Sequence, residues 1–108
     1  MTEAKLTLKL KEKRSIQFEV TCGEKIKAKE SDEPIYIFHA IFYSITSNFK
    51  IIIDQKISLN ILVEEIIPRN KDTIINFSES GIEGILQIKM YLFPLDIYIL
   101  DYFFYCTF

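Results

Sequence analysis

The sequence has few of the residues that mark extended, secreted or membrane-spanning chains. Three glycines and three prolines in 108 residues exclude collagen-like and linker-like segments. Residues 1–14 are polar and alternating, without the apolar core of a secretory signal peptide. No window of 18 uncharged apolar residues occurs, so we expect no membrane-spanning helix and a cytoplasmic location.

Residues that carry chemistry are also scarce. His39 is the single histidine and lies in an apolar run, which favours a structural role over nucleophilic catalysis. The adjacent carboxylates of Glu64 and Glu65 are predicted to point to opposite faces of a strand. There is no Gly-rich phosphate loop. We therefore expect a non-enzymatic protein with no catalytic residues, no metal site and no cofactor.

The two cysteines, Cys22 and Cys106, lie 84 positions apart. This spacing matches neither a CxxC motif nor a small disulfide-rich domain. Two buried free thiols are the favoured interpretation. The alternative is a disulfide between them, which would contribute about 4–5 kcal/mol in the chain-entropy model.

Composition indicates a single globular domain over residues 1–108. Apolar residues make up 49% of the chain and charged residues 26%, and the formal net charge is −2. The chain has 20 isoleucines but only four asparagines and three glutamines. Few thermolabile amides beside many isoleucines favour a thermophilic source or one of its viruses.

The N-terminal third predicts three strands, at residues 5–10, 16–22 and 25–29. In the first, Leu6, Leu8 and Leu10 alternate with polar residues, which is the period of a half-buried strand. The first two segments are predicted to form a hairpin across the charged link 11–14.

A helix is predicted near residues 33–48. The segment Ser31-Asp32-Glu33-Pro34 has the composition of a helix start. Apolar residues then follow at one helical face: Phe38, Ile41, Phe42, Ile45 and Phe49.

The second half predicts further strands. They lie near residues 50–53, 57–63, 73–77, 85–93 and 96–108, with a loop at 68–72. The predicted fold class is α+β: a mainly antiparallel β-sheet of about seven short strands, with the one helix near residues 33–48 packed on it.

A surplus of aromatic residues near the C-terminus predicts the function. Residues 96–108 form either a last strand or an extended tail, and as a strand they are apolar on both faces, which is more than one helical layer would cover. Such a strand is either central in a sandwich or barrel that covers both faces, or its second face meets another subunit, which we favour. A membrane-surface contact is a third interpretation, but no basic belt adjoins this segment.

We expect a protein–protein interaction or assembly protein, as a homodimer or a subunit of a complex. Its interface residues would be Tyr91, Phe93, Tyr98, Tyr102, Phe104 and Phe108. The small size and the lack of motifs also fit a viral or mobile-element factor.

Nucleic-acid binding is the alternative function. Eight of the 13 basic residues precede position 30. Two lysine-bearing strands side by side would form a basic plate from Lys5, Lys9, Lys11, Lys25, Lys27 and Lys29. The residues between these lysines are polar or acidic rather than aromatic, so a solvated surface is the favoured interpretation.

Overall fold

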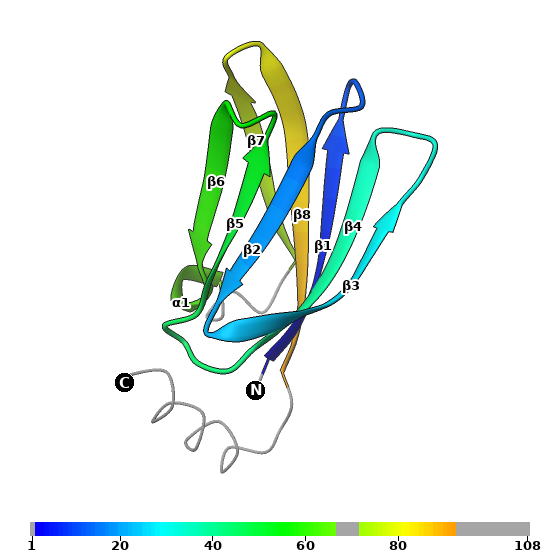
Figure 1. Ribbon diagram of the computed structural model, residues 1–108. Coiled ribbons are helices and arrows are strands. Elements are labelled where there is room, and N and C mark those ends of the chain that lie inside the picture. The colour runs from blue at the N-terminus through cyan, green and yellow to red at the C-terminus, as the bar shows by residue number, and fades with distance from the viewer. Residues whose placement is uncertain (1, 67–71, 93–108) are drawn as a thin grey trace.

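The computed structural model describes residues 2–66 and 72–92, which form two β-sheets and one short helix (Figure 1). In chain order the elements are β1 (Thr2–Leu10), β2 (Ile16–Thr21), β3 (Gly23–Glu30), β4 (Ile35–Phe42), β5 (Asn48–Ile53), β6 (Ile57–Leu62), α1 (Val63–Ile66), β7 (Thr73–Glu79) and β8 (Ile82–Leu92). The expected mainly antiparallel β architecture is confirmed.

The strands divide unequally between the two layers. Sheet A has five strands in the order β3-β4-β1-β8-β7, and sheet B has three in the order β2-β5-β6. Every pairing is antiparallel. The two layers pack face to face, so the fold is a sandwich of two sheets rather than one sheet covered by a helix (Figure 1).

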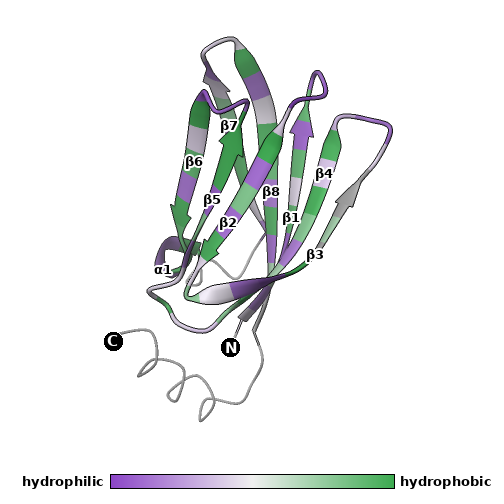
Figure 2. Cartoon of the chain, viewed as in Figure 1, coloured by the Kyte–Doolittle hydropathy of each residue, from purple (hydrophilic) through white to green (hydrophobic). Residues whose placement is uncertain are grey.

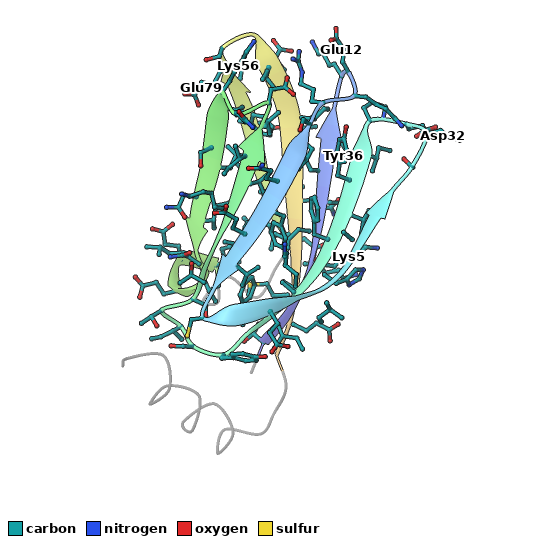
Figure 3. The ribbon with its side chains drawn as sticks, in the orientation of Figure 1. Lys5, Glu12, Asp32, Tyr36, Lys56 and Glu79 are labelled. Carbon is teal, nitrogen blue, oxygen red and sulfur yellow. The ribbon has the colours of Figure 1, made fainter. Side chains whose placement is uncertain are left out.

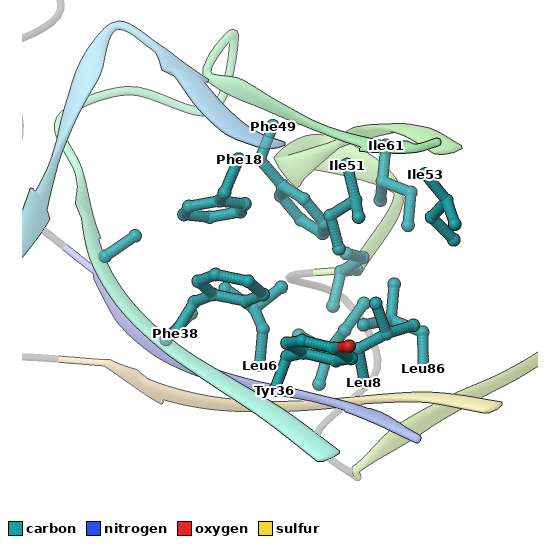
Figure 4. Packing of buried hydrophobic residues seen from close by; sticks show 14 of the residues in the cluster. Leu6, Leu8, Phe18, Tyr36, Phe38, Phe49, Ile51, Ile53, Ile61 and Leu86 are labelled. Atoms are coloured by element: carbon teal, nitrogen blue, oxygen red, sulfur yellow. The ribbon is translucent and has the colours of Figure 1, made fainter. Parts of the chain in front are cut away.

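The core lies between the sheets and follows the period-two pattern of the strands (Figure 2). On β1, Leu6 and Leu8 are fully buried, as their alternation predicts. Sheet B contributes Phe18, Phe49 and Ile51 from the opposite side (Figure 4). Burial of these large side chains supplies the main stabilisation of the sandwich.

The predicted helix near residues 33–48 is wrong, because this region forms β4, a turn and the start of β5. Along β4, Tyr36, Phe38, Ala40 and Phe42 are buried in alternation with half-buried residues. The predicted helix cap is instead a turn, in which the Ser31 hydroxyl donates to the Glu33 carbonyl at 3.0 Å. Aromatic and β-branched residues dominate β4, and they favour strands over helices.

The predicted hairpin of the first two strands is also wrong, because β1 belongs to sheet A and β2 to sheet B. The chain changes sheets again between β2 and β3, at a corner formed by Cys22 and Gly23. Cys22 has a φ of 59°, and its carbonyl accepts hydrogen bonds from the Ser47 hydroxyl at 2.7 Å and the Tyr43 amide at 3.0 Å. A Cβ at Gly23 would lie 2.2 Å from the Ile41 carbonyl oxygen, so only glycine fits here.

A polar cluster joins the sheets at the opposite end. Asp54 accepts hydrogen bonds from the Arg14 guanidinium at 2.8 Å and from the Ser15 amide at 2.9 Å. These bonds, with the charge of Arg14, hold the pKa of Asp54 below its ordinary value. The Tyr36 hydroxyl donates to the Arg14 carbonyl at 3.0 Å and accepts from its amide at 2.9 Å. The cluster thereby ties β4 to the link between β1 and β2; Figure 3 labels Tyr36 at this end.

Candidate protein-interaction surfaces

The outer face of sheet A carries isoleucines where a solvent-facing sheet usually carries polar residues. Ile74 on β7 and Ile85 on β8 expose 59% and 43% of their surface. On β4, Ile35 and Ile37 are half-buried on the same side of the sheet, because they alternate with the inward-facing Tyr36. We call these four residues the isoleucine face.

Strand register places the isoleucine face in two neighbouring rows across sheet A. In one row, Ile74 and Ile37 flank Gln87 and Thr7. The adjacent row consists of Asn76, Ile85, Lys9 and Ile35. Apolar side chains from β4, β7 and β8 therefore lie on one surface, and Thr7 and the exposed Lys9 of β1 lie between them.

The outer face of sheet B differs in composition. Its exposed outward residues on β2 and β6 are all polar: Gln17, Glu19, Thr21, Ser58 and Asn60. Ile52 on β5 and Leu62 on β6 also face outward, but they are half-buried. This is the ordinary composition of a sheet face in water. Of the two outer faces, sheet A therefore has the composition expected of a docking surface.

A shallow hollow of about 540 Å³ lies at one end of the isoleucine face. Lys9, Asn76, Glu83 and Ile85 are among its lining residues. Lys11 forms an ion pair with Glu83 at its rim, and this hydrogen bond with the ammonium charge holds the pKa of Glu83 below its ordinary value. Both side chains are at least half exposed, so the pair contributes little to folding stability.

A basic row borders the other end of the isoleucine face. Register places Lys5 on β1 directly between His39 on β4 and Lys89 on β8, and Lys27 on β3 follows next to His39. Neighbouring strands bring the side chains of Lys5, His39 and Lys89 closer than their sequence separation indicates. Figure 3 labels Lys5 at its place on sheet A. His39 is half-buried on this face rather than mid-helix.

The structure separates the six lysines of the predicted nucleic-acid site. Lys5 and Lys9 share the outer face of sheet A, whereas Lys25 lines a groove between the two sheets. Lys11 is paired with Glu83. Lys27 and Lys29 belong to β3, and their side chains lie outside what the structure describes. The predicted arrangement of two adjacent basic strands is wrong, because β4 lies between β1 and β3.

The predicted aromatic interface falls almost wholly beyond the described residues. The backbone of Tyr91 belongs to β8, opposite Glu3 of β1, but its side chain is not described. The other five residues lie outside the described ranges: Phe93, Tyr98, Tyr102, Phe104 and Phe108. Cys106 lies there too. Cys22 is half-buried and disulfide-bonded, so the favoured interpretation of a buried free thiol is wrong for this residue.

The described ranges contain neither a grouped set of metal ligands nor a membrane-spanning helix. Over residues 2–66 and 72–92, no three His, Cys, Asp or Glu side chains are grouped so that they could hold a metal ion. Within the same part of the chain, no helix has the length and apolarity to cross a membrane.

Sequence reasoning missed the isoleucine face because it assigned Ile35 and Ile37 to a helix. An alternating pattern was present in β4, but both of its faces are apolar, and this hid the period of two. Ile74 and Ile85 do alternate with inward residues, yet alternation alone does not show that their strands are neighbours.

No protein-family model, curated protein or solved structure matches this chain.

Proposed function

We propose that this protein is a small interaction and assembly domain that associates with a second copy of itself through the isoleucine face. The observation that supports this most strongly is the contrast between the two outer faces of the sandwich. Exposed isoleucines are concentrated on sheet A, whereas β2 and β6 present polar residues on sheet B. Contiguous apolar patches on otherwise polar domains usually mark protein contacts.

Charge complementarity along β8 favours a second copy as the occupant. Along β8, the outward positions run Glu83, Ile85, Gln87 and Lys89. When this column meets its own copy in antiparallel orientation, Glu83 of one chain faces Lys89 of the other, and Ile85 faces Gln87. The same orientation brings the two isoleucine rows together. Such self-complementarity is what a two-fold interface requires.

Mass in solution tests this proposal. By light scattering after size exclusion, we expect twice the chain mass of 12.7 kDa at high micromolar concentration. High salt should leave the dimer in place, because the apolar contact dominates over the screened charges at its rim.

Two glutamate variants sharpen the test. Ile85→Glu should give a monomer, because it places a carboxylate within the contact. Ile45→Glu is the matched control: Ile45 exposes 42% of its surface, against 43% for Ile85, but lies in the loop between β4 and β5. A monomeric wild-type protein, or a dimer that survives Ile85→Glu, would contradict the proposal.

Nucleic-acid binding remains the second candidate, and the basic row of Lys5, His39 and Lys89 is the observation that favours it. Such binding should weaken steeply with salt, and Lys5→Glu with Lys9→Glu should abolish it. The described side chains of this face include no Phe or Tyr on which bases could stack, which makes this the weaker candidate. Absence of salt-sensitive binding to single-stranded DNA or RNA would exclude it.

A further inference from the structure

A second surface lies between the two sheets, along the side of the sandwich where β2 and β3 diverge from their shared corner (Figure 1). A groove of about 450 Å³ opens between them. One wall is β2, with Ile16 and Phe18; the other is formed by β3 and β4, with Ala28 and Phe38. Neither the isoleucine face nor the basic row contributes to it.

The groove exists because sheet B is narrower than sheet A. Phe18 of β2 stacks on Phe38 of β4, with ring centroids 4.7 Å apart and planes at 18° (Figure 4). Therefore β2 lies opposite β4. Sheet A continues one strand further, to β3, but among the described strands nothing lies beside β2 to cover it. The inner side chain of Ala28 on β3 is accordingly exposed.

The edge of β2 along this groove carries backbone groups that no described strand pairs. The Ser15 carbonyl accepts from the Asp54 amide at 2.8 Å, so Ser15 is directed toward β5. Because successive residues of a strand direct their N–H and C=O groups to alternate sides, those of Ile16, Phe18 and Val20 are directed away from β5, into the groove. A strand edge of this kind is a template for another strand.

The other free edge of the groove is less suited to pairing. The ladder between β3 and β4 is irregular between Lys25 and Lys27, which marks a β-bulge. Bulges and lysines are common devices that prevent edge pairing. In contrast, β2 pairs with β5 in unbroken register over its six residues. The groove thus has one edge that accepts a strand and an apolar floor formed by Phe18 and Phe38.

We propose that this groove binds a single extended segment of a partner protein, which adds to β2 as a fourth strand of sheet B. Its inward side chains would be apolar and would cover Ala28 and the rim of the Phe18–Phe38 stack. Its outward side chains would include a basic residue, because Glu19 is the exposed outward residue at the middle of β2. This proposal is independent of self-association through the isoleucine face.

A second copy of the whole domain does not fit this groove. In a pairing of β2 with its own copy, each chain would have to place its β3 in the space that the other chain's β4 already occupies, because β4 lies opposite β2. An isolated extended segment carries no second sheet that would collide with β3. The width of the groove therefore selects one strand rather than the edge of another sheet.

A synthetic hexapeptide of alternating valine and lysine, with both ends blocked, is the probe. In an antiparallel addition its valines lie opposite Ile16, Phe18 and Val20, so valine amides donate to β2 and lysine amides face away. We expect shifts and slower hydrogen exchange at the amides of these three residues in NMR spectra. Methylation of the valine nitrogens should weaken binding by about tenfold or more, and methylation of the lysine nitrogens should not.

Variants of Ala28 complete the test. Ala28→Trp should fill the groove and weaken peptide binding by about tenfold or more, while Ala28→Ser should bind as the wild type does. Because Ala28 is exposed, both variants should keep the wild-type melting temperature. Equal binding of the two methylated peptides, shifts confined to β6 or β7, or no binding at all would overturn the proposal. The titration should also be repeated with the Ile85→Glu variant. Peptide binding that is unchanged in this variant shows that the groove binds the peptide whether or not the protein dimerises.

Discussion

Replacement of Gly23 by alanine tests the corner that sends β2 and β3 into different sheets. The new Cβ would lie 2.2 Å from the Ile41 carbonyl oxygen and 2.9 Å from a methyl group of Val20. Ordinary contact begins at 3.4 Å, so the first distance falls about 1.2 Å short. The Val20 methyl can rotate, but the carbonyl belongs to the backbone of β4 and cannot move without disturbing its pairing.

The expected cost is at the upper end of the range for overpacking, about 3 kcal/mol. For a domain of about 100 residues, this corresponds to a fall in melting temperature of roughly 12–24 °C. Thermal unfolding followed by far-UV circular dichroism, together with the urea midpoint, measures both quantities. Domains of this size have a free energy of unfolding of about 5–15 kcal/mol, which exceeds the expected cost, so the variant should stay folded at low temperature.

Gly81→Ala is the matched control. Gly81 has a φ of 78° in the turn between β7 and β8, and a Cβ there would meet no atom within 4 Å. Only the left-handed backbone penalises alanine, by about 1–2 kcal/mol. If Gly23→Ala were no more destabilising than Gly81→Ala, the close approach of β3 to β4 at the corner would be refuted.

Two further predictions concern the polar cluster that joins the sheets. Because the pKa of Asp54 is lowered in the folded state, its carboxylate stabilises the protein above the unfolded pKa, and this contribution is lost as pH falls through the folded pKa. Asp54→Asn should therefore lower the urea midpoint at pH 7, and the difference from wild type should shrink as the pH falls below about 3.9, the ordinary pKa of an aspartate, and through the lower folded pKa. A difference that does not change with pH would contradict this. Tyr36→Phe removes both hydrogen bonds to the backbone of Arg14 and should cost about 1–3 kcal/mol in urea unfolding. An unchanged midpoint would show that the hydroxyl bonds equally well to water.

The strands with one polar face could be predicted from the sequence. Leu6, Leu8 and Leu10 alternate with polar residues, and the structure buries all three. Leu86 and Ile88, within the strand predicted at residues 85–93, are likewise buried on β8. In these segments the apolar residues face the core and the polar residues face solvent, so the alternation in the sequence predicts which side chains are buried.

Where both faces of a strand are apolar, the sequence was misleading. On β4 the inward Tyr36 and Phe38 alternate with Ile35 and Ile37, so His39 is the single outward polar residue and does not reveal the period. The same outward isoleucines form part of the proposed dimer interface. Failure of the prediction and the candidate site thus have one physical cause, a second apolar face.

Pairing between distant strands was beyond the reach of local patterns. The row that joins Lys5 to His39 and Lys89 depends on β1 lying between β4 and β8. Equally, the groove depends on a chain that changes sheets at Cys22, a left-handed residue that is not glycine. No turn signal in the sequence distinguishes that corner from an ordinary hairpin.

Solvent accessibility of the isoleucine methyl groups tests the dimer interface most directly. With isoleucine methyls labelled for NMR, a soluble paramagnetic probe broadens those that water can reach. In the single chain, Ile74 and Ile85 are exposed to 59% and 43%, and Ile26 and Ile45 to 49% and 42%. We expect Ile74 and Ile85 to be protected at high protein concentration while Ile26 and Ile45 broaden. Equal broadening of all four methyl groups would contradict association through this face.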